Sequence, residues 1–150
     1  FMALVVLGNV DEITFYSPDQ KAKGRAVHEG AAQMIQWARE HEILIVSGGD
    51  MFDQLNVGRQ AENLIIEETV GFTPLEILKH ATSNAATVLG WTGDMNPYKY
   101  GTLGVIEEGA YADMILVEGN PLEDITLIRD YENNFKLIVK DGQIWKNTLN

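Results

Sequence analysis

One carboxylate in this sequence, Asp50, is well placed for chemistry. Residues 43–46 are four bulky apolar residues, three of them β-branched, and they predict a strand over residues 43–47 that is buried on both faces of a parallel sheet. Gly48 and Gly49 follow, and glycines allow a sharp backbone turn. Asp50 should therefore lie at the C-terminal end of a buried strand, where α/β sheets and barrels keep their active sites.

Other interpretations of this turn remain open. An aspartate after two glycines can be a turn or cap residue, and Asp53 is most simply the cap of the next helix. A strand that ends in Gly-Gly before a helix could also cradle a phosphate, which would make this a nucleotide-binding α/β domain. Neither G-x-G-x-x-G nor G-K-[ST] follows the turn, so the phosphate interpretation is the weaker one.

The remaining titratable residues suggest structural roles. The sequence has three histidines, His28, His41 and His80, which all fall in or at the end of predicted helices, so we interpret them as helix-surface or packing residues. We interpret the two glutamates at 67–68 as part of a solvated helix face. We interpret Asp113 as a structural residue that precedes a strand.

The elements that would position Asp50 alternate between strand and helix. Residues 3–7 predict a short strand. Separately, the three tryptophans, at 37, 91 and 145, are expected in a core or an interface. Ser17, Pro18 and Gln20 have the pattern of a capped helix start, and apolar residues at helical spacing extend this helix to about His41. Strand, helix and strand in this order are typical of a right-handed parallel crossover.

After the turn, helices give way to strands. One helix is expected to stop at Gly71, and another to begin at the capping residue Thr73 and to end at Gly90, with an apolar face that includes Leu75 and Ala81. Short strands are predicted at 105–106, 113–118, 135–140 and 143–145, with a tight hairpin at 141–142, which is Asp-Gly. We expect a first domain at 1–92 and a second at 93–150.

Composition limits the possible partners. The 150 residues are 45% apolar, enough for a globular core, and their net charge of −11 argues against nucleic acid as a partner. No apolar run reaches the roughly 18 residues of a membrane span. The absence of cysteine excludes disulfides and thiolate ligands but leaves the compartment unknown, with the cytoplasm slightly favoured.

Four segments carry a family resemblance. They are Gly48-Gly49-Asp50, residues 73–86 (TPLEILKHATSNAA), residues 101–113 (GTLGVIEEGAYAD) and Asn120-Pro121-Leu122. In order and spacing they resemble the C-terminal part of a metal-dependent amidohydrolase, nearest to the imidazolonepropionase and Xaa-Pro dipeptidase-like branch. The resemblance implies the C-terminal part of a (β/α)8 barrel, with residues 43–47 as its last strand, plus strands of a small β-sandwich.

The resemblance also implies a role for Asp50. In that family the aspartate after the eighth strand binds the active-site metal, usually zinc, and accepts the proton of the attacking water, and Asp50 occupies this motif position. The sequence differs from the family pattern in two respects. Gly49 replaces the usual Thr or Ser, and the His-x-His pair and other ligands of earlier strands are absent. We therefore expect a fragment, from about the seventh strand onward, that is inactive alone.

The expected function is that of a parent hydrolase acting on C–N bonds in a small amide, dipeptide or cyclic amide substrate, with a divalent metal, zinc by resemblance, and Asp50 as metal ligand and general base. Its substrate pocket would include the loop at 51–56. The alternative is a structural fragment without catalysis. Open strand edges and apolar helix faces would favour self-association, so we expect a homo-oligomer.

Overall fold

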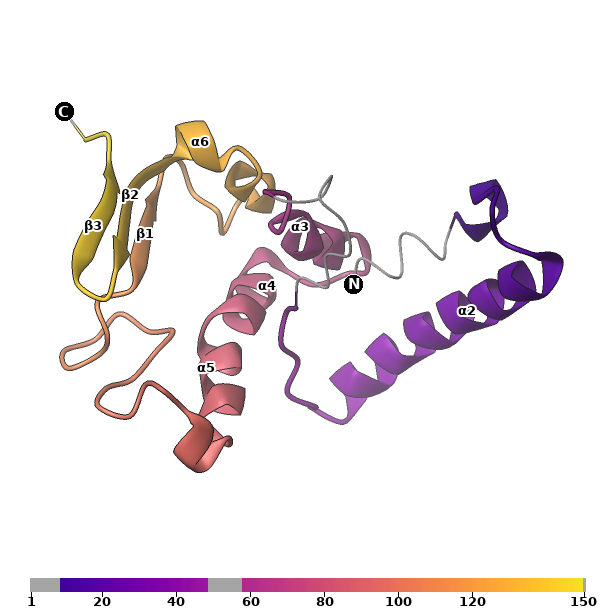
Figure 1. Ribbon diagram of the computed structural model, residues 1–150, viewed down its shortest axis with the longest axis horizontal. Coiled ribbons are helices and arrows are strands. Elements are labelled where there is room, and N and C mark those ends of the chain that lie inside the picture. The colour runs from indigo at the N-terminus through magenta and orange to yellow at the C-terminus, as the bar shows by residue number, and fades with distance from the viewer. Residues whose placement is uncertain (1–8, 49–57, 150) are drawn as a thin grey trace. The chain divides into compact units, whose positions relative to one another are not determined.

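The computed structural model describes residues 9–48 and 58–149, and these belong to two compact units, Phe1–Ile45 and Val46–Asn150 (Figure 1). The predicted strand at 3–7, the loop at 51–56, Asp50 and Asp53 lie outside the described residues. The domain boundary expected between residues 92 and 93 stays a prediction.

The first unit is dominated by one long helix. A 3-10 turn, η1 (Val10–Glu12), precedes α2 (Pro18–Glu40). Ser17 Oγ accepts a hydrogen bond from the backbone N–H of Gln20 at 3.3 Å, and Gln20 Oε1 accepts one from the backbone N–H of Ser17 at 2.8 Å. This reciprocal capping box confirms the predicted helix start. The helix ends at Glu40, with His41 as its C-cap residue, close to the predicted end.

The strand predicted at 43–47 is not formed. Residues 43–48 run without regular secondary structure, and the side chains of Ile43, Leu44 and Val46 are exposed instead of buried. A strand requires a neighbouring strand to complete its hydrogen-bond ladder. In the part of the chain that the structure describes, the backbone N–H of Ser47 donates instead to the carbonyl oxygen of His80, a helical residue, at 3.1 Å.

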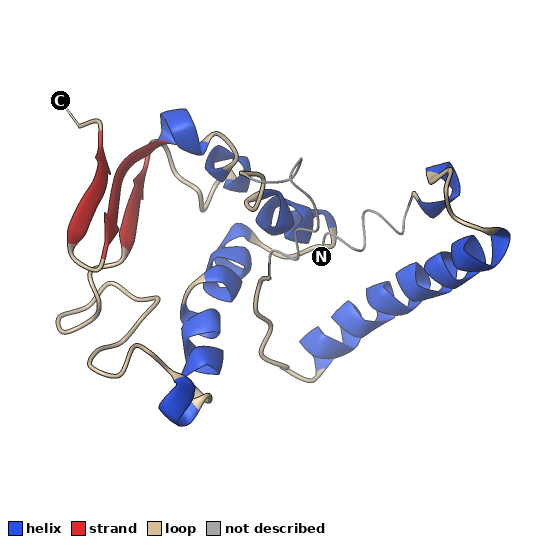
Figure 2. Cartoon of the chain, viewed as in Figure 1, coloured by secondary structure: helices blue, strands red, loops and turns tan. Residues whose placement is uncertain are grey.

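Three helices follow in the second unit (Figure 2). They are α3 (Glu62–Thr69), α4 (Pro74–Ala81) and α5 (Ser83–Gly90). Gly71 has a φ of +92°, which favours glycine and confirms the predicted stop before Thr73. Thr73 and Glu76 form the predicted capping box at the start of α4.

The single helix expected from Thr73 to Gly90 is broken in two. Thr82 leaves the helical conformation, with φ −120° and ψ −94°, and its Oγ1 donates to the carbonyl oxygen of Leu78 at 2.6 Å. Gly104 lies against this break so closely that a Cβ atom there would be 2.6 Å from the Thr82 carbonyl carbon and oxygen.

The buried side of α4 also differs from the predicted face. Ile77 and His80 are buried, whereas Leu75 is 51% exposed and Ala81 is exposed. The side of α4 that carries Ile77 and His80 faces α3, because His80 bonds to Glu67 of α3.

The chain ends in an antiparallel sheet of three strands in the order β1–β2–β3. They are β1 (Met114–Val117), β2 (Phe135–Lys140) and β3 (Gln143–Asn147), so the three later strand predictions are confirmed. Asp141 and Gly142 both have positive φ, +52° and +73°, as the Asp-Gly hairpin requires. The remaining short elements are η3 (Gly93–Met95), η4 (Ile125–Ile128) and α6 (Tyr131–Asn134).

Two further expectations are wrong for the described residues. Residues 105–106 form no strand, and Ile106 is 82% exposed. For Trp37, Trp91 and Trp145 the core alternative is wrong, because these side chains are at least half exposed, whereas the interface alternative stays a prediction. Within the described parts of the chain, no helix has both the length and the apolar character needed to cross a membrane.

Candidate functional site

The polar cluster of the second unit is centred on Glu67, in the last turns of α3. Glu67 is fully buried, so the prediction that residues 67–68 form a solvated helix face is wrong for Glu67 and right for its exposed neighbour Glu68. A buried carboxylate requires hydrogen-bond partners, because leaving it unpaired costs several kilocalories per mole.

Two side chains satisfy Glu67. Ser47 Oγ donates to Glu67 Oε1 at 2.7 Å, and His80 Nδ1 lies 2.6 Å from Glu67 Oε2. We call Ser47, Glu67 and His80 the Glu67 network. The ring of Phe72 packs edge-on against the His80 ring, with the centroids 4.9 Å apart. The prediction that His80 is a packing residue is therefore confirmed.

The geometry of the network suits a structural restraint on Ser47 and does not suit activation of Ser47 as a nucleophile. In a serine hydrolase triad, the histidine accepts the proton of the serine hydroxyl and the carboxylate orients the histidine. Here the carboxylate lies between the other two groups, so Ser47 donates to Glu67 and not to His80. Together with the backbone bond from Ser47 to His80, the network connects residue 47 to both α3 and α4.

Sequence reasoning missed the network, although it had one usable signal. Ile77 and His80 are three residues apart in α4, so a buried Ile77 places His80 on the same helix face. Nothing local indicated Glu67 as its partner, because the two side chains are 13 residues apart in the sequence.

Asp113 has the structural role that we predicted. Its carboxylate accepts hydrogen bonds from Lys140 Nζ and from the backbone N–H of Asp141, both at 2.6 Å. Both hydrogen bonds lower the pKa of Asp113, and the bond from Lys140 has the larger effect. Asp113 thereby holds the start of β1 to the hairpin between β2 and β3.

A second ion pair joins α3 to the segment after η4. Arg129 Nε and a terminal nitrogen of Arg129 donate to the two oxygens of Glu62 at 2.8 and 3.1 Å. The hydrogen bond from Arg129, supported by its charge, lowers the pKa of Glu62.

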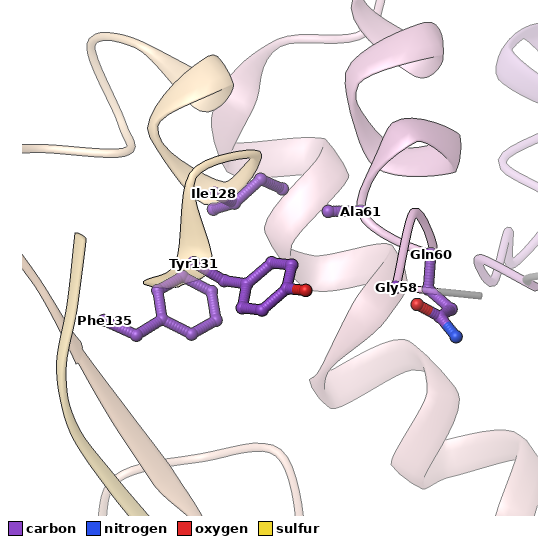
Figure 3. A pocket seen from close by; sticks show the side chains of 6 residues that line it. All are labelled: Gly58, Gln60, Ala61, Ile128, Tyr131 and Phe135. Carbon is purple, nitrogen blue, oxygen red and sulfur yellow. The ribbon is translucent and has the colours of Figure 1, made fainter. Parts of the chain in front are cut away.

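One pocket of about 360 Å³ lies where residues 58–61 approach residues 128–135 (Figure 3). The residues that line it are Gly58, Gln60, Ala61, Ile128, Tyr131 and Phe135. The described lining residues include no carboxylate and no histidine.

Among the residues that the structure describes, no three His, Cys, Asp or Glu side chains gather where they could hold a metal ion. His28 lies within α2 and His41 at its C-terminal end, as predicted. Asp50 lies outside the described residues, and its role as a metal ligand stays a prediction.

The sequence and the fold together identify the family. Residues 16–144, most of the chain, match the model of the amidohydrolase family. The chain belongs to the amidohydrolase family, and the predicted resemblance is confirmed.

Three relatives illustrate the match. The Aspergillus niger ochratoxinase is 40% identical over 63 residues, which are 42% of this chain and 12% of the ochratoxinase sequence. Its crystal structure superposes with a TM-score of 0.76 and 28% identity, covering 97% of this chain and 31% of that one. A structure described as an amidohydrolase gives a TM-score of 0.73 at 26% identity, covering 99% of this chain and 33% of that one.

The third relative, a Xaa-Pro dipeptidase with bound methionine, shares the fold, with a TM-score of 0.73 at 24% identity, covering 97% of this chain and 33% of that one. The chain therefore spans about a third of the length of the solved structures that it resembles. The mixed helix and strand structure agrees with a partial amidohydrolase barrel followed by a small antiparallel sheet.

Proposed function

We propose that the complete protein containing this chain is a metal-dependent hydrolase of C–N bonds in a small amide, dipeptide or cyclic amide substrate. The match of residues 16–144 to the amidohydrolase family carries this proposal. The similarity to ochratoxinase and to a Xaa-Pro dipeptidase supports a small substrate with an amide or peptide bond.

In this proposal Asp50 is a metal ligand and the general base. It follows Gly48-Gly49 at the motif position of the family aspartate, and a carboxylate oxygen suits zinc or another divalent cation. A bound cation would supply the acidity of a water molecule at neutral pH. The Asp50 carboxylate would accept a proton and later return it to the leaving amine.

The remaining ligands would come from outside the described residues. A single carboxylate cannot hold a catalytic metal, and catalytic zinc sites use three protein ligands. We therefore propose that residues 1–150 alone are inactive and that the active site is completed by earlier parts of a barrel.

The exposed apolar side chains of Ile43, Leu44 and Val46 support an assembly role for this segment. In the complete protein they would be covered by neighbouring barrel elements. If the chain were produced alone, the same surface would favour self-association, which is the structural alternative to catalysis.

The test compares two conservative variants of the complete protein. Activity is measured against a panel of Xaa-Pro dipeptides and N-acyl amino acids, before and after chelation, and again after zinc is added. We expect Asp50→Asn to lower kcat by at least about 1000-fold, since general base and ligand are lost together. The control is Asp94→Asn, because Asp94 is fully exposed and lies 3.5 Å from Lys99. Full activity of Asp50→Asn would refute the proposal.

A further inference from the structure

One member of the buried Glu67 network, Ser47, directly precedes Gly48-Gly49-Asp50 in the sequence. Two residues, Gly48 and Gly49, therefore separate Ser47 from Asp50. Residue 47 is fixed by two bonds: its hydroxyl donates to Glu67, and its backbone N–H donates to the carbonyl oxygen of His80.

These bonds matter because they join an irregular segment to two helices, whereas the backbone N–H of Ile43 bonds only locally, to the carbonyl oxygen of Ala38 at 2.8 Å. Residues 43–48 form no regular element, and Ile43, Leu44 and Val46 are exposed. The partners of Ser47, in contrast, lie in two helices that contact one another, α3 and α4, and both side chains are buried. The network thus ties Ser47 to a pair of helices that contact one another.

We propose that Glu67 and His80 are positioning residues, which hold Ser47 and thereby restrain the chain three positions before Asp50. This inference rests on the proposed function of Asp50. Neither residue is assigned contact with substrate. Their contribution is geometric, and small displacements of a catalytic group are sufficient to lower turnover strongly.

The first test measures local order. In the complete protein, hydrogen exchange is followed in peptides that contain residues 46–48. We expect Ser47→Ala and Glu67→Leu to increase exchange in these peptides by about tenfold or more, because opening no longer requires breaking the network. Glu67→Gln should restore much of the protection, since its amide offers an acceptor to Ser47 and a donor to His80.

The second test separates positioning from stability. Glu67→Met combined with His80→Leu replaces the pair with apolar side chains and should retain stability, because replacing both partners of a buried hydrogen bond by apolar groups can be nearly neutral. We expect this double variant to fold, yet to lower kcat about 10- to 100-fold with little change in KM, because Ser47 has lost its side-chain partner.

The matched control is Glu68→Leu. Glu68 is the next residue of α3 and its side chain is exposed, so this change should alter neither exchange nor kcat. Unchanged exchange and kcat in both Ser47→Ala and the double variant would overturn the positioning role. If Asp50→Asn abolishes activity while these variants remain normal, only the positioning inference fails. If Asp50→Asn is fully active, the proposed function is refuted, and the positioning inference that rests on it is refuted as well.

Discussion

Glu67 Oε2 and His80 Nδ1 lie 2.6 Å apart, and the two side chains are 0% and 7% exposed. An acid and a base buried in contact depend on one another, because each would otherwise lose its hydrogen-bond partner inside the protein. The pair joins α3 to α4, and Ser47 completes it.

This mutual dependence predicts a strongly non-additive pair. His80→Ala should lower the free energy of unfolding by about 1–3 kcal/mol, because it leaves Oε2 of the buried Glu67 without its hydrogen-bond partner. The combined Glu67→Met and His80→Leu variant should recover most of this loss. Urea unfolding of the complete protein measures both, and a double variant as unstable as the sum of its single changes would contradict the interpretation.

Glu62 and Arg129 predict a pH dependence. The pKa of Glu62 is lowered by its bonds from Arg129, so the pair stabilises the fold above the ordinary carboxyl pKa of 4.5. The contribution is lost as pH falls through the lowered pKa. Because Arg129 is 54% exposed, solvent screening limits the contribution to about 0.5–1 kcal/mol.

We expect Glu62→Gln to be less stable than the parent at pH 7 by this amount and equally stable at the acid end of the range. Unfolding midpoints measured from pH 7 to pH 3 test this. Glu68→Gln is the control, and a stability difference for Glu62→Gln that persists unchanged in acid would argue against the ion pair.

Gly104 should tolerate no side chain. Its φ is +73°, and an added Cβ would lie 2.6 Å from the backbone of Thr82. Gly104→Ala is expected to destabilise by about 3 kcal/mol or more, since backbone strain and a clash with main-chain atoms combine. Gly109 has a φ of +86° but open space around it, so Gly109→Ala should cost only about 1–2 kcal/mol. Thermal unfolding of both variants distinguishes clash from strain, and equal effects would count against the close approach.

The capping box of α4 makes a smaller contribution. Thr73 Oγ1 accepts from the backbone N–H of Glu76 at 3.3 Å, and Glu76 Oε2 accepts from that of Thr73 at 2.8 Å. Thr73→Ala should lower stability by about 1 kcal/mol, whereas Thr73→Ser should be near neutral because serine also caps well. Chemical denaturation would refute the role of the hydroxyl if both variants behaved alike.

Features that depend on neighbours in the chain were predictable from sequence. The starts of α2 and α4 at Ser17 and Thr73, the stop at Gly71 and the hairpin at 141–142 were all predicted correctly, because caps and tight turns are made by residues at most four positions apart. The family was also recognisable, because the motif segments are contiguous in the sequence.

Features that depend on distant parts of the chain were decided only by the tertiary structure. Glu67 is buried because His80 and Ser47 reach it from 13 and 20 residues away, and no local pattern marks that meeting. The helix breaks at Thr82, with Gly104 lying against the break, and residues 43–47 form no strand, since a strand needs a partner as well as apolar side chains. Local chemistry determined where elements begin and turn, whereas burial and pairing were set by contacts between segments far apart in the sequence.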